Sequence, residues 1–427
     1  MNILFVIPST INHHQRKGLR SRMGARLFLA PPLTFPMLAA NTPPQHHLRL
    51  IDELTEPIDF NVHYDLVGIT AMTPDIPRAY ELADEFRKRG IRVVLGGWHP
   101  TLYPDEALQH ADSVVCGEGE EIWPQLLNDL EHERLKPRYQ NETPVDFAAQ
   151  PPPNRNLLHR RGFLFNDVQA TRGCPMGCTF CAVTHQTIGR NCRYRPVENI
   201  VKEIDVLPRK YFLFVDSTLT QNIAYTKTLF TALRNSRKRF SCNGNVSTLY
   251  KDDELLRLSV EAGCREWTIG FESLSQDSLN MLGKHGNRVE EFKPAIRKIH
   301  DYGLAVAGNF IFGADGDRPG IFQQTIDAIN TWDIDLPAFS ILTPLPGTPL
   351  FENLEQDGRL LTKDWSLYDC RHVVFQPRHF TVEALALEYE DARCTVFSSY
   401  QNLHRAIHCL DYGWSSLFLT GAVNFFS

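Results

Sequence analysis

The chain has 427 residues, of which 43% are hydrophobic and 22% are charged, and its formal net charge is −6 at pH 7. This composition excludes a disordered or fibrous chain and predicts a globular protein of two or three domains. The negative charge gives no electrostatic basis for a nucleic-acid partner, although the locally basic stretch 15–22 is either a solvated loop or a contact for an anionic group.

The sequence also gives no sign of a membrane or secreted protein. No apolar run reaches the roughly 18 residues that a bilayer-spanning helix needs, and the first eight residues lack the features of a signal peptide. The ten cysteines are irregularly spread except for one triplet, which is typical of reduced thiols rather than of a disulfide framework. We therefore expect a cytoplasmic protein without a transmembrane segment.

Residues 1–132 alternate short apolar runs with helical patterns. The helical pattern at 76–89 places apolar residues at helical spacing and is followed by Gly90, a plausible stop. The alternation predicts an α/β, doubly wound (Rossmann-like) domain, in which ligands bind at the carboxyl ends of the strands. The apolar runs that we expect to be buried parallel strands are 3–7, 48–52, 65–70, 93–97 and 113–116.

The predicted strand ends of this domain are rich in glycine and small residues. Missing side chains let a flat or bulky ligand approach the backbone, although the same glycines could simply close tight turns. The candidate ligand-binding residues are Thr70, Gly96, Gly97, His99, Pro100, Thr101, Gly117 and Glu118.

After a proline-rich segment, 133–160, which we interpret as an extended interdomain linker, the alternation resumes at a longer period through 161–349. Six strand–helix units predict an open, partial (β/α)6 barrel of the TIM type, with catalytic residues at the carboxyl ends of its strands. The expected strands are 167–170, 211–216, 240–243, 266–272, 305–312 and 338–342, with helices at 252–261 and 290–302 among those between them.

Polar residues follow successive strands of this predicted barrel and should converge at one mouth. Asp216 and Ser217 end the second strand, whereas Glu272 and Ser273 end the fourth. Asn309 to Gly313 lie late in the fifth strand. A single acidic residue at such a place can also be only a helix cap.

Three cysteines in one loop after the first barrel strand are the most informative feature. Cys174, Cys178 and Cys181 have the spacing C-x3-C-x2-C, with no obvious fourth cysteine ligand. A cubane 4Fe-4S cluster on three thiolates would keep one iron open for another molecule, which suggests catalysis. The alternative is a structural zinc site with His185 as the fourth ligand and Cys192 nearby.

The triplet, with Phe180 before its last cysteine, resembles the radical S-adenosylmethionine enzymes. The preceding doubly wound domain is similar to the cobalamin-binding domain of a subgroup that includes hopanoid methylases, phosphorus methylases and anaerobic magnesium-protoporphyrin cyclases. The resemblance covers about residues 1 to 350. Further phrases that carry it are 31–39 (PPLTFPMLA), 96–101 (GGWHPT), 117–120 (GEGE), 193–196 (RYRP), 269–273 (IGFES) and 344–349 (PLPGTP).

The resemblance implies that the three cysteines are the catalytic and metal-binding residues, holding a 4Fe-4S cluster whose open iron binds S-adenosylmethionine. One electron, from a reductase- or flavodoxin-type donor, then releases a 5′-deoxyadenosyl radical. It further implies that Phe180 lies beside the adenine and that Asp216 and Ser217 face the methionine part. Glu272 and Ser273 would approach the ribose or methionine part, and Asn309 and Gly313 would lie on the strand that contacts the adenine.

The resemblance also implies cobalamin as a further cofactor. The motif Asp-x-His-x-x-Gly, which supplies a histidine ligand to cobalt in other proteins, is not matched by 12–18, so we expect water or an apolar residue at the lower face. An altered domain without cobalamin is the alternative.

With both cofactors, the implied reaction is methylation of an unactivated carbon, or of phosphorus, in a small-molecule, natural-product or lipid substrate. Radical cyclisation, rearrangement or oxidation with the same domains is the alternative within enzymes. A non-catalytic iron–sulfur protein is the alternative of another class.

We expect residues 350–427 to form a small, mainly helical region that caps the barrel or chooses the substrate. Its aromatic residues either line a pocket or pack the open edge of the barrel. The last segment, 414–426, is too short to span a membrane. The aromatic residues in question are Trp365, Tyr368, Phe375 and Phe380.

Overall fold

The computed structural model describes residues 1–9, 32–158, 165–185 and 189–411. The predictions made for 12–18, 15–22 and 414–426, and the first residue of 31–39, lie outside the described residues.

The N-terminal half is a sheet of six parallel strands in the order β2-β1-β3-β4-β5-β6. Alternate side chains of each strand point to opposite faces, so Leu4 and Val6 pack in one core and Ile3 and Phe5 in another. All five predicted strands are confirmed. The strands are β1 (Asn2–Ile7), β2 (His47–Asp52), β3 (Leu66–Thr70), β4 (Arg92–Gly96), β5 (Ser113–Cys116) and β6 (Arg138–Gln140).

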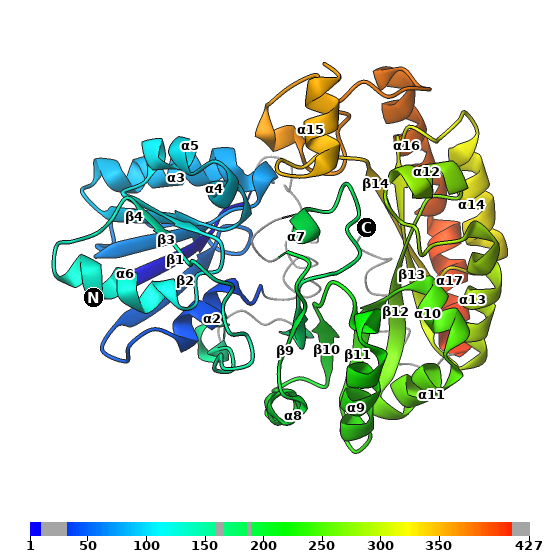
Figure 1. The fold of residues 1–427 in the computed structure, drawn as a ribbon, viewed down its shortest axis with the longest axis horizontal. Coiled ribbons are helices and arrows are strands. Elements are labelled where there is room, and N and C mark those ends of the chain that lie inside the picture. The colour runs from blue at the N-terminus through cyan, green and yellow to red at the C-terminus, as the bar shows by residue number, and fades with distance from the viewer. Residues whose placement is uncertain (10–31, 159–164, 186–188, 412–427) are drawn as a thin grey trace.

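Helices cover both faces of this sheet, as a doubly wound domain requires (Figure 1). One face carries the predicted helix, α3 (Ile76–Lys88), which buries Ile76, Ala79, Leu82, Ala83 and Phe86 at helical spacing and is followed by Gly90 with φ 75°. The same face carries α5 (Pro104–His110), and the opposite face carries α2 (Thr34–Ala40) and α6 (Ile122–Glu131).

The second sheet confirms the predicted partial barrel. Its six parallel strands lie in the order β14-β13-β12-β11-β10-β7, and the helices lie along its outer side (Figure 1). The strands are β7 (Phe165–Val168), β10 (Tyr211–Phe214), β11 (Arg239–Gly244), β12 (Cys264–Glu272), β13 (Ala305–Phe312) and β14 (Leu336–Ile341). The helices are α8 (Val197–Asp205), α9 (Ile223–Leu233), α10 (Val246–Lys251), α11 (Asp253–Ala262), α12 (Gln276–Met281), α13 (Val289–Asp301) and α14 (Ile321–Thr331).

Three short strands were not predicted from the sequence. β6 lies inside the segment that we interpreted as linker and extends the first sheet by pairing with β5. β8 (Thr171–Arg172) and β9 (Arg193–Tyr194) form an antiparallel ribbon that frames the cysteine loop.

The C-terminal region is mainly helical, as predicted, with α15 (Pro349–Gln356), α16 (Val382–Val396) and α17 (Ser399–Asp411). Of its four aromatic residues, Tyr368 and Phe375 are each 1% exposed, and Trp365 and Phe380 pack against apolar clusters. These side chains therefore fill the interior, and Phe375 also reaches a cavity. Within the described ranges, no helix combines the length and the apolar character needed to cross a membrane.

The C-terminal region is joined to the N-terminal domain by aromatic contacts. Trp365 stacks on Tyr103, with 5.5 Å between the ring centroids, and lies edge-on to buried His99 at 5.1 Å. Because these contacts join the N-terminal domain to the C-terminal region, we call His99, Tyr103 and Trp365 the clasp.

The clasp predicts the effect of Trp365→Ala. Removal of the indole leaves a void between the two regions, so we expect the free energy of unfolding to fall by about 2 to 3 kcal/mol. Chemical denaturation measures this loss. Leu361→Ala is the matched control, because Leu361 is 50% exposed and its loss should cost less than about 0.5 kcal/mol. Equal stability of the two variants would contradict a structural role for the clasp.

Candidate functional site

The cysteine loop begins directly after β8 and is held in a tight turn. Cys174 and Cys178 are 8% and 6% exposed, and Cys181 is half-buried just before α7 (Ala182–His185). Gly173 has φ 98°, and a side chain there would collide with the carbonyl of Asn191, which lies two residues before β9. The ribbon thus requires glycine immediately before the first cysteine.

A buried lysine that the sequence analysis did not single out lies beside the three thiols. Lys284 Nζ is 2.7 Å from Glu272 Oε1, and both side chains are largely buried. Burial raises the pKa of Cys178 to about 11, and the charge of Lys284 opposes this rise. A fixed cation next to three thiols suits a group that they bind as thiolates, since it compensates part of their negative charge.

Asp216 is buried against the backbone that precedes the cysteine loop and is not exposed at the carboxyl ends of the strands. Its carboxylate is fully buried and accepts hydrogen bonds from the backbone N–H of Ala170, at 3.1 Å, and of Thr171. Burial raises the pKa of Asp216 to about 6 against the effect of these bonds. Asp216 therefore holds the backbone that leads into the cysteine loop, while the adjacent Ser217 is exposed.

The ends of β12 and β13 are joined through buried Asp317. Ser273 Oγ donates to Asp317 Oδ1 at 3.1 Å, and the N–H of Gly313 donates to Asp317 Oδ2 at 2.9 Å. Glu272 has φ 67°, next to an irregularity in the pairing of β12 with β13. Such strained backbone is often found where a side chain must be aimed at a functional site.

Asn309 and Phe180 are two further residues that the sequence predicted for the barrel site. Asn309 is exposed, and because its neighbour Phe310 is buried in the helix-side core, strand alternation puts Asn309 on the other, concave face of the sheet. Phe180 packs beside Leu282 and Ala314. The structure thus brings Cys174, Cys178, Cys181, Glu272 and Lys284 close enough for their charges to interact.

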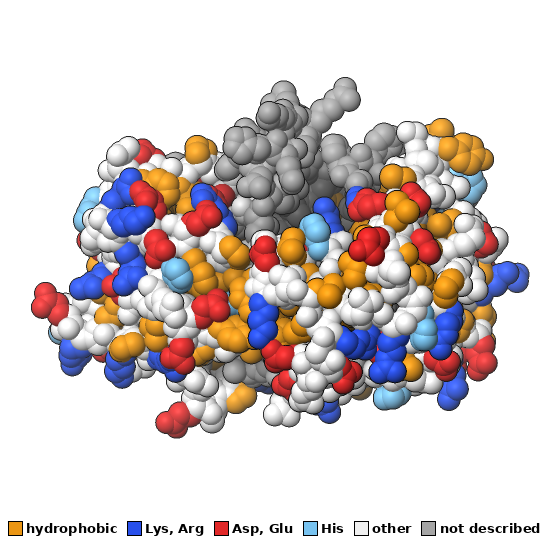
Figure 2. Space-filling view, turned by 90° about the horizontal axis from the view of Figure 1, so that it is seen from above, with side chains coloured by type: hydrophobic (Ala, Val, Ile, Leu, Met, Phe, Trp, Pro, Cys, Tyr) orange, Lys and Arg blue, Asp and Glu red, His pale blue; other side chains and the backbone are white. Residues whose placement is uncertain are grey.

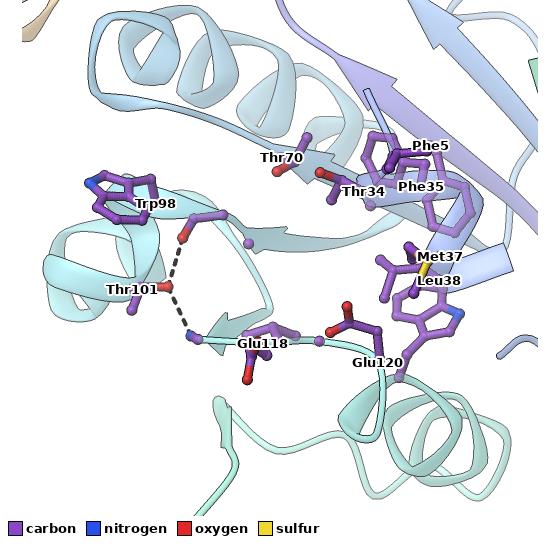
Figure 3. A pocket seen from close by; sticks show the side chains of 18 of the residues that line it. Phe5, Thr34, Phe35, Met37, Leu38, Thr70, Trp98, Thr101, Glu118 and Glu120 are labelled. Atoms are coloured by element: carbon purple, nitrogen blue, oxygen red, sulfur yellow. Dashed lines mark hydrogen bonds between the residues drawn. The ribbon is translucent and has the colours of Figure 1, made fainter. Parts of the chain in front are cut away.

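A cavity of about 370 Å³ lies at the carboxyl ends of the N-terminal strands (Figure 3). Of the predicted residues, Thr70, Gly96, Gly97, Thr101, Gly117 and Glu118 line it, whereas His99 and Pro100 do not. His99 is buried instead and belongs to the clasp through its contact with Trp365. The apolar walls that the sequence analysis did not assign include Phe5, Phe35, Met37, Trp98 and Trp123.

At the rim of the cavity, one threonine side chain joins two backbone segments. Thr101 Oγ1 donates to the carbonyl of Gly97 at 2.7 Å and accepts from the N–H of Gly117 at 2.9 Å, which ties two strand ends together (Figure 3). Gly97 has φ 97°, and a Cβ there would lie 2.6 Å from Thr70 Oγ1. The open backbone and the apolar walls suit a bulky ligand that lies on the sheet edge.

Buried ion pairs join this cavity to the cysteine loop. Glu118 accepts from Arg172 at 2.7 Å and from Arg193 at 2.6 Å, and Arg172 also pairs with Glu120 at 2.8 Å. Arg172 lines the cavity and is two residues before Cys174. Burial opposes the charge of Glu118, but hydrogen bonds from Arg193 and Arg172 hold the pKa of its carboxyl below the ordinary value. We call these four residues the ion bridge.

Comparison with known proteins gives two family matches. Residues 168–329 match the radical SAM superfamily, and residues 38–127 match the B12 binding domain. Among curated relatives, the bacteriochlorophyllide d C-12(1)-methyltransferase of Chlorobaculum tepidum is 33% identical, over 87% of this chain and 83% of that protein. The anaerobic magnesium-protoporphyrin IX monomethyl ester cyclase of Cereibacter sphaeroides is 27% identical, over 78% and 59%.

The fold is also that of a solved structure. The cobalamin-dependent S-adenosylmethionine radical enzyme OxsB, with aqua-cobalamin and S-adenosylmethionine bound, superposes with a TM-score of 0.72. The superposition covers 96% of this chain and 68% of OxsB at 14% sequence identity.

The ion bridge predicts the effect of Glu118→Gln. The substitution leaves Arg193 without its acidic partner, so we expect the free energy of unfolding to fall by about 2 kcal/mol and the retention of a ligand in the cavity to fall by about tenfold. Thermal unfolding and equilibrium dialysis with cobalamin measure the two effects. The exposed Glu142→Gln should change neither.

The pH dependence follows from the lowered pKa of Glu118. The stabilisation is present above the unfolded-state pKa, near 4.5, and is lost as the pH falls through the lower folded-state pKa. The stability difference between the wild type and Glu118→Gln should therefore stay constant from pH 5 to 8 and shrink only in more acidic buffer. A difference that disappears near neutral pH would contradict the assignment.

Proposed function

The chain belongs to the cobalamin-dependent radical S-adenosylmethionine enzymes, and from this membership we propose that it methylates an unactivated carbon on a cyclic tetrapyrrole. The proposal depends on one observation, the match to a bacteriochlorophyllide d methyltransferase along most of both chains. The cyclase relative is also named for a tetrapyrrole, which supports the substrate class independently of the reaction.

The family membership decides between the alternatives for the cysteine triplet. The cofactors are a 4Fe-4S cluster, S-adenosylmethionine and cobalamin, and the zinc alternative is wrong because residues 168–329 match the radical SAM superfamily. The non-catalytic alternative is wrong for the same reason. When bound, the cluster supplies the electron that splits S-adenosylmethionine, and cobalamin supplies the methyl group that is transferred.

The described residues fit these groups. We propose that Cys174, Cys178 and Cys181 hold the cluster and that Lys284, fixed by Glu272, compensates the negative charge of the thiolates. Asp216 positions the loop through the backbone of Ala170 and Thr171.

We assign the cavity at 70, 96–97, 101 and 117–118 to cobalamin and the concave face around Asn309 to the nucleoside part of S-adenosylmethionine. The ion bridge then fixes the position of the cobalamin cavity relative to the cysteine loop. We also propose a division into a cobalamin domain at 1–132, a linker at 133–160, a barrel at 161–349 and a capping region from 350, with strand β6 of the linker paired to the first sheet.

Methyl transfer is favoured over cyclisation or oxidation because the methyltransferase relative is more similar and matches more of its own length than the cyclase. The enzyme also needs an external one-electron donor, and we propose a reductase- or flavodoxin-type protein in this role.

Labelled methyl transfer tests the reaction and the substrate class. Anaerobic reconstituted enzyme is incubated with dithionite, hydroxocobalamin, S-adenosylmethionine labelled in its methyl group, and either bacteriochlorophyllide d or magnesium-protoporphyrin monomethyl ester. We expect the chlorophyllide to gain a labelled methyl group and Cys178→Ala to form no 5′-deoxyadenosine. Ring closure without label would establish the cyclase alternative, and release of 5′-deoxyadenosine with neither product would reject the tetrapyrrole.

Lys284→Met tests the buried cation. We expect the charge of Lys284 to lower the activation free energy by about 2 kcal/mol, so its loss should slow 5′-deoxyadenosine release by about 30-fold. The variant Lys284→Arg keeps the charge and should restore part of the rate. Lys293→Met is the control, because Lys293 is exposed on α13. An unchanged rate in Lys284→Met at full iron content would reject the role.

A further inference from the structure

One exposed face of the barrel lies directly over the cysteine loop. It consists of the outer residues of the loop, the exposed residue after α7 and the segment that follows α12. Its exposed residues are Pro175, Met176, Arg190, Met281, His285 and Arg288, and we call them the loop face.

The segment after α12 is in contact with the loop. The N–H of Thr179 donates to the carbonyl of Leu282 at 3.0 Å, and Thr179 Oγ1 donates to the carbonyl of Met281 at 3.3 Å. A Cβ on Gly286 would lie 3.7 Å from Met176 Cε. The loop face is therefore one continuous surface built from two distant parts of the chain.

The cover over Cys178 includes two glycines, and the Arg190 guanidinium lies against one of them, Gly177. Gly177 and Gly283 have φ 71° and 72°, and a Cβ on Gly283 would lie 3.4 Å from Cys178 Cα. Cys178 is only 6% exposed, and the backbone of these glycines together with the Arg190 guanidinium lies between it and the surface. Electron transfer between proteins weakens steeply with distance, so a thin cover at this place favours entry of an electron.

The apolar side chains of the loop face suit a transient protein contact. Met176 is 38% exposed and Met281 is 54% exposed. Exposed methionines adapt their shape to different partners, and weak electron-transfer encounters use small interfaces.

The charges of the loop face are cationic and available. Neither Arg190 nor Arg288 forms an ion pair with any residue in the described part of the chain. The guanidinium of Arg190 lies across Gly177, because a Cβ there would be 2.7 Å from Arg190 Nη2. Asp277 and Glu290 are the exposed acids that flank the segment in sequence. The chain as a whole carries −6, and the face seen in Figure 2 mixes both signs. Two exposed arginines without an ion pair to any described residue therefore differ from the general pattern of charge.

We propose that the loop face is the docking surface of an acidic one-electron carrier protein, which delivers its electron through the cover over Cys178. The inference rests on the proposed function. In the step, the carrier is oxidised by one electron and the cluster is reduced from the 2+ to the 1+ state, with no atom transferred. Opposite charges on the two proteins would speed their encounter and make the rate depend on salt.

The test compares two reductants on the same reconstituted holoenzyme. An acidic flavodoxin with its reductase needs the docking surface, whereas dithionite does not. The double variant Arg190→Glu, Arg288→Glu should release 5′-deoxyadenosine about tenfold more slowly with flavodoxin and within about twofold of the wild type with dithionite. The flavodoxin rate should also lose its salt dependence, and Arg190→Lys, Arg288→Lys should restore it.

Arg237→Glu is the matched control. Arg237 is exposed and lies just before β11, at the end of the barrel opposite the cysteine loop. Its reversal should leave both rates unchanged.

Three outcomes would overturn the docking surface: an unchanged flavodoxin rate in the double variant, an equal loss in Arg237→Glu, or an equal loss with both reductants, since the arginines would then act on the cluster itself. Failure of the wild type to release 5′-deoxyadenosine with dithionite would instead reject the proposed function, so the two failures are distinguishable.

Discussion

The buried ion bridge between the end of the first sheet and the β8–β9 ribbon is the constraint on which the site depends. A buried charge is unfavourable unless its hydrogen-bonding groups are satisfied. Both carboxylate oxygens of Glu118 receive arginine donors, and one also accepts from the N–H of Val145 at 3.0 Å. Arg172 in turn lies 4.3 Å from the ring centroid of Phe147. This set of partners is satisfied in one placement of the β8–β9 ribbon on the first sheet, so the bridge fixes how the cavity faces the cysteine loop.

That placement explains why two ordinary α/β units form one site. Parallel sheets present their ligand-binding loops at the carboxyl ends of the strands. The 370 Å³ cavity is lined by Gly96 and Gly117 from the first sheet and also by Gln169 and Val215, which follow β7 and β10 of the second. The two carboxyl edges therefore share one volume. A group carried by one domain can meet a group activated by the other without crossing bulk solvent.

The sequence predicted the strands well because buried parallel strands are continuous apolar runs. It missed β6 because Arg138–Gln140 is a three-residue edge strand without such a run. It also grouped His99 with the candidate residues of the glycine-rich strand ends, whereas the lining of the cavity does not include His99. Residues 98–102 form the short helix α4 (Trp98–Leu102), in which Trp98 and Thr101 share one face and His99 takes another.

Lys284 and Asp216 show a different limit of prediction. Lys284 stands alone in a glycine-containing loop, without periodicity or spacing to the cysteines, and only the tertiary contact with Glu272 reveals it. Asp216 was expected to face a ligand, yet its partners are backbone N–H groups of residues 170 and 171, and a sequence pattern carries no information on such bonds.

The cations near the cysteine loop fall into two physical classes, and this division separates two tasks. Lys284 and Arg172 are buried and paired with acids, so their positions are fixed and solvent ions screen them little. Arg190 and Arg288 are exposed, so salt screens them and a partner protein can reach them. The first pair can set the charge and the shape of the site at any ionic strength, whereas the second pair can act only on what approaches from outside. A substitution in one class should therefore leave the task of the other intact, which a single mixed patch of charge would not allow.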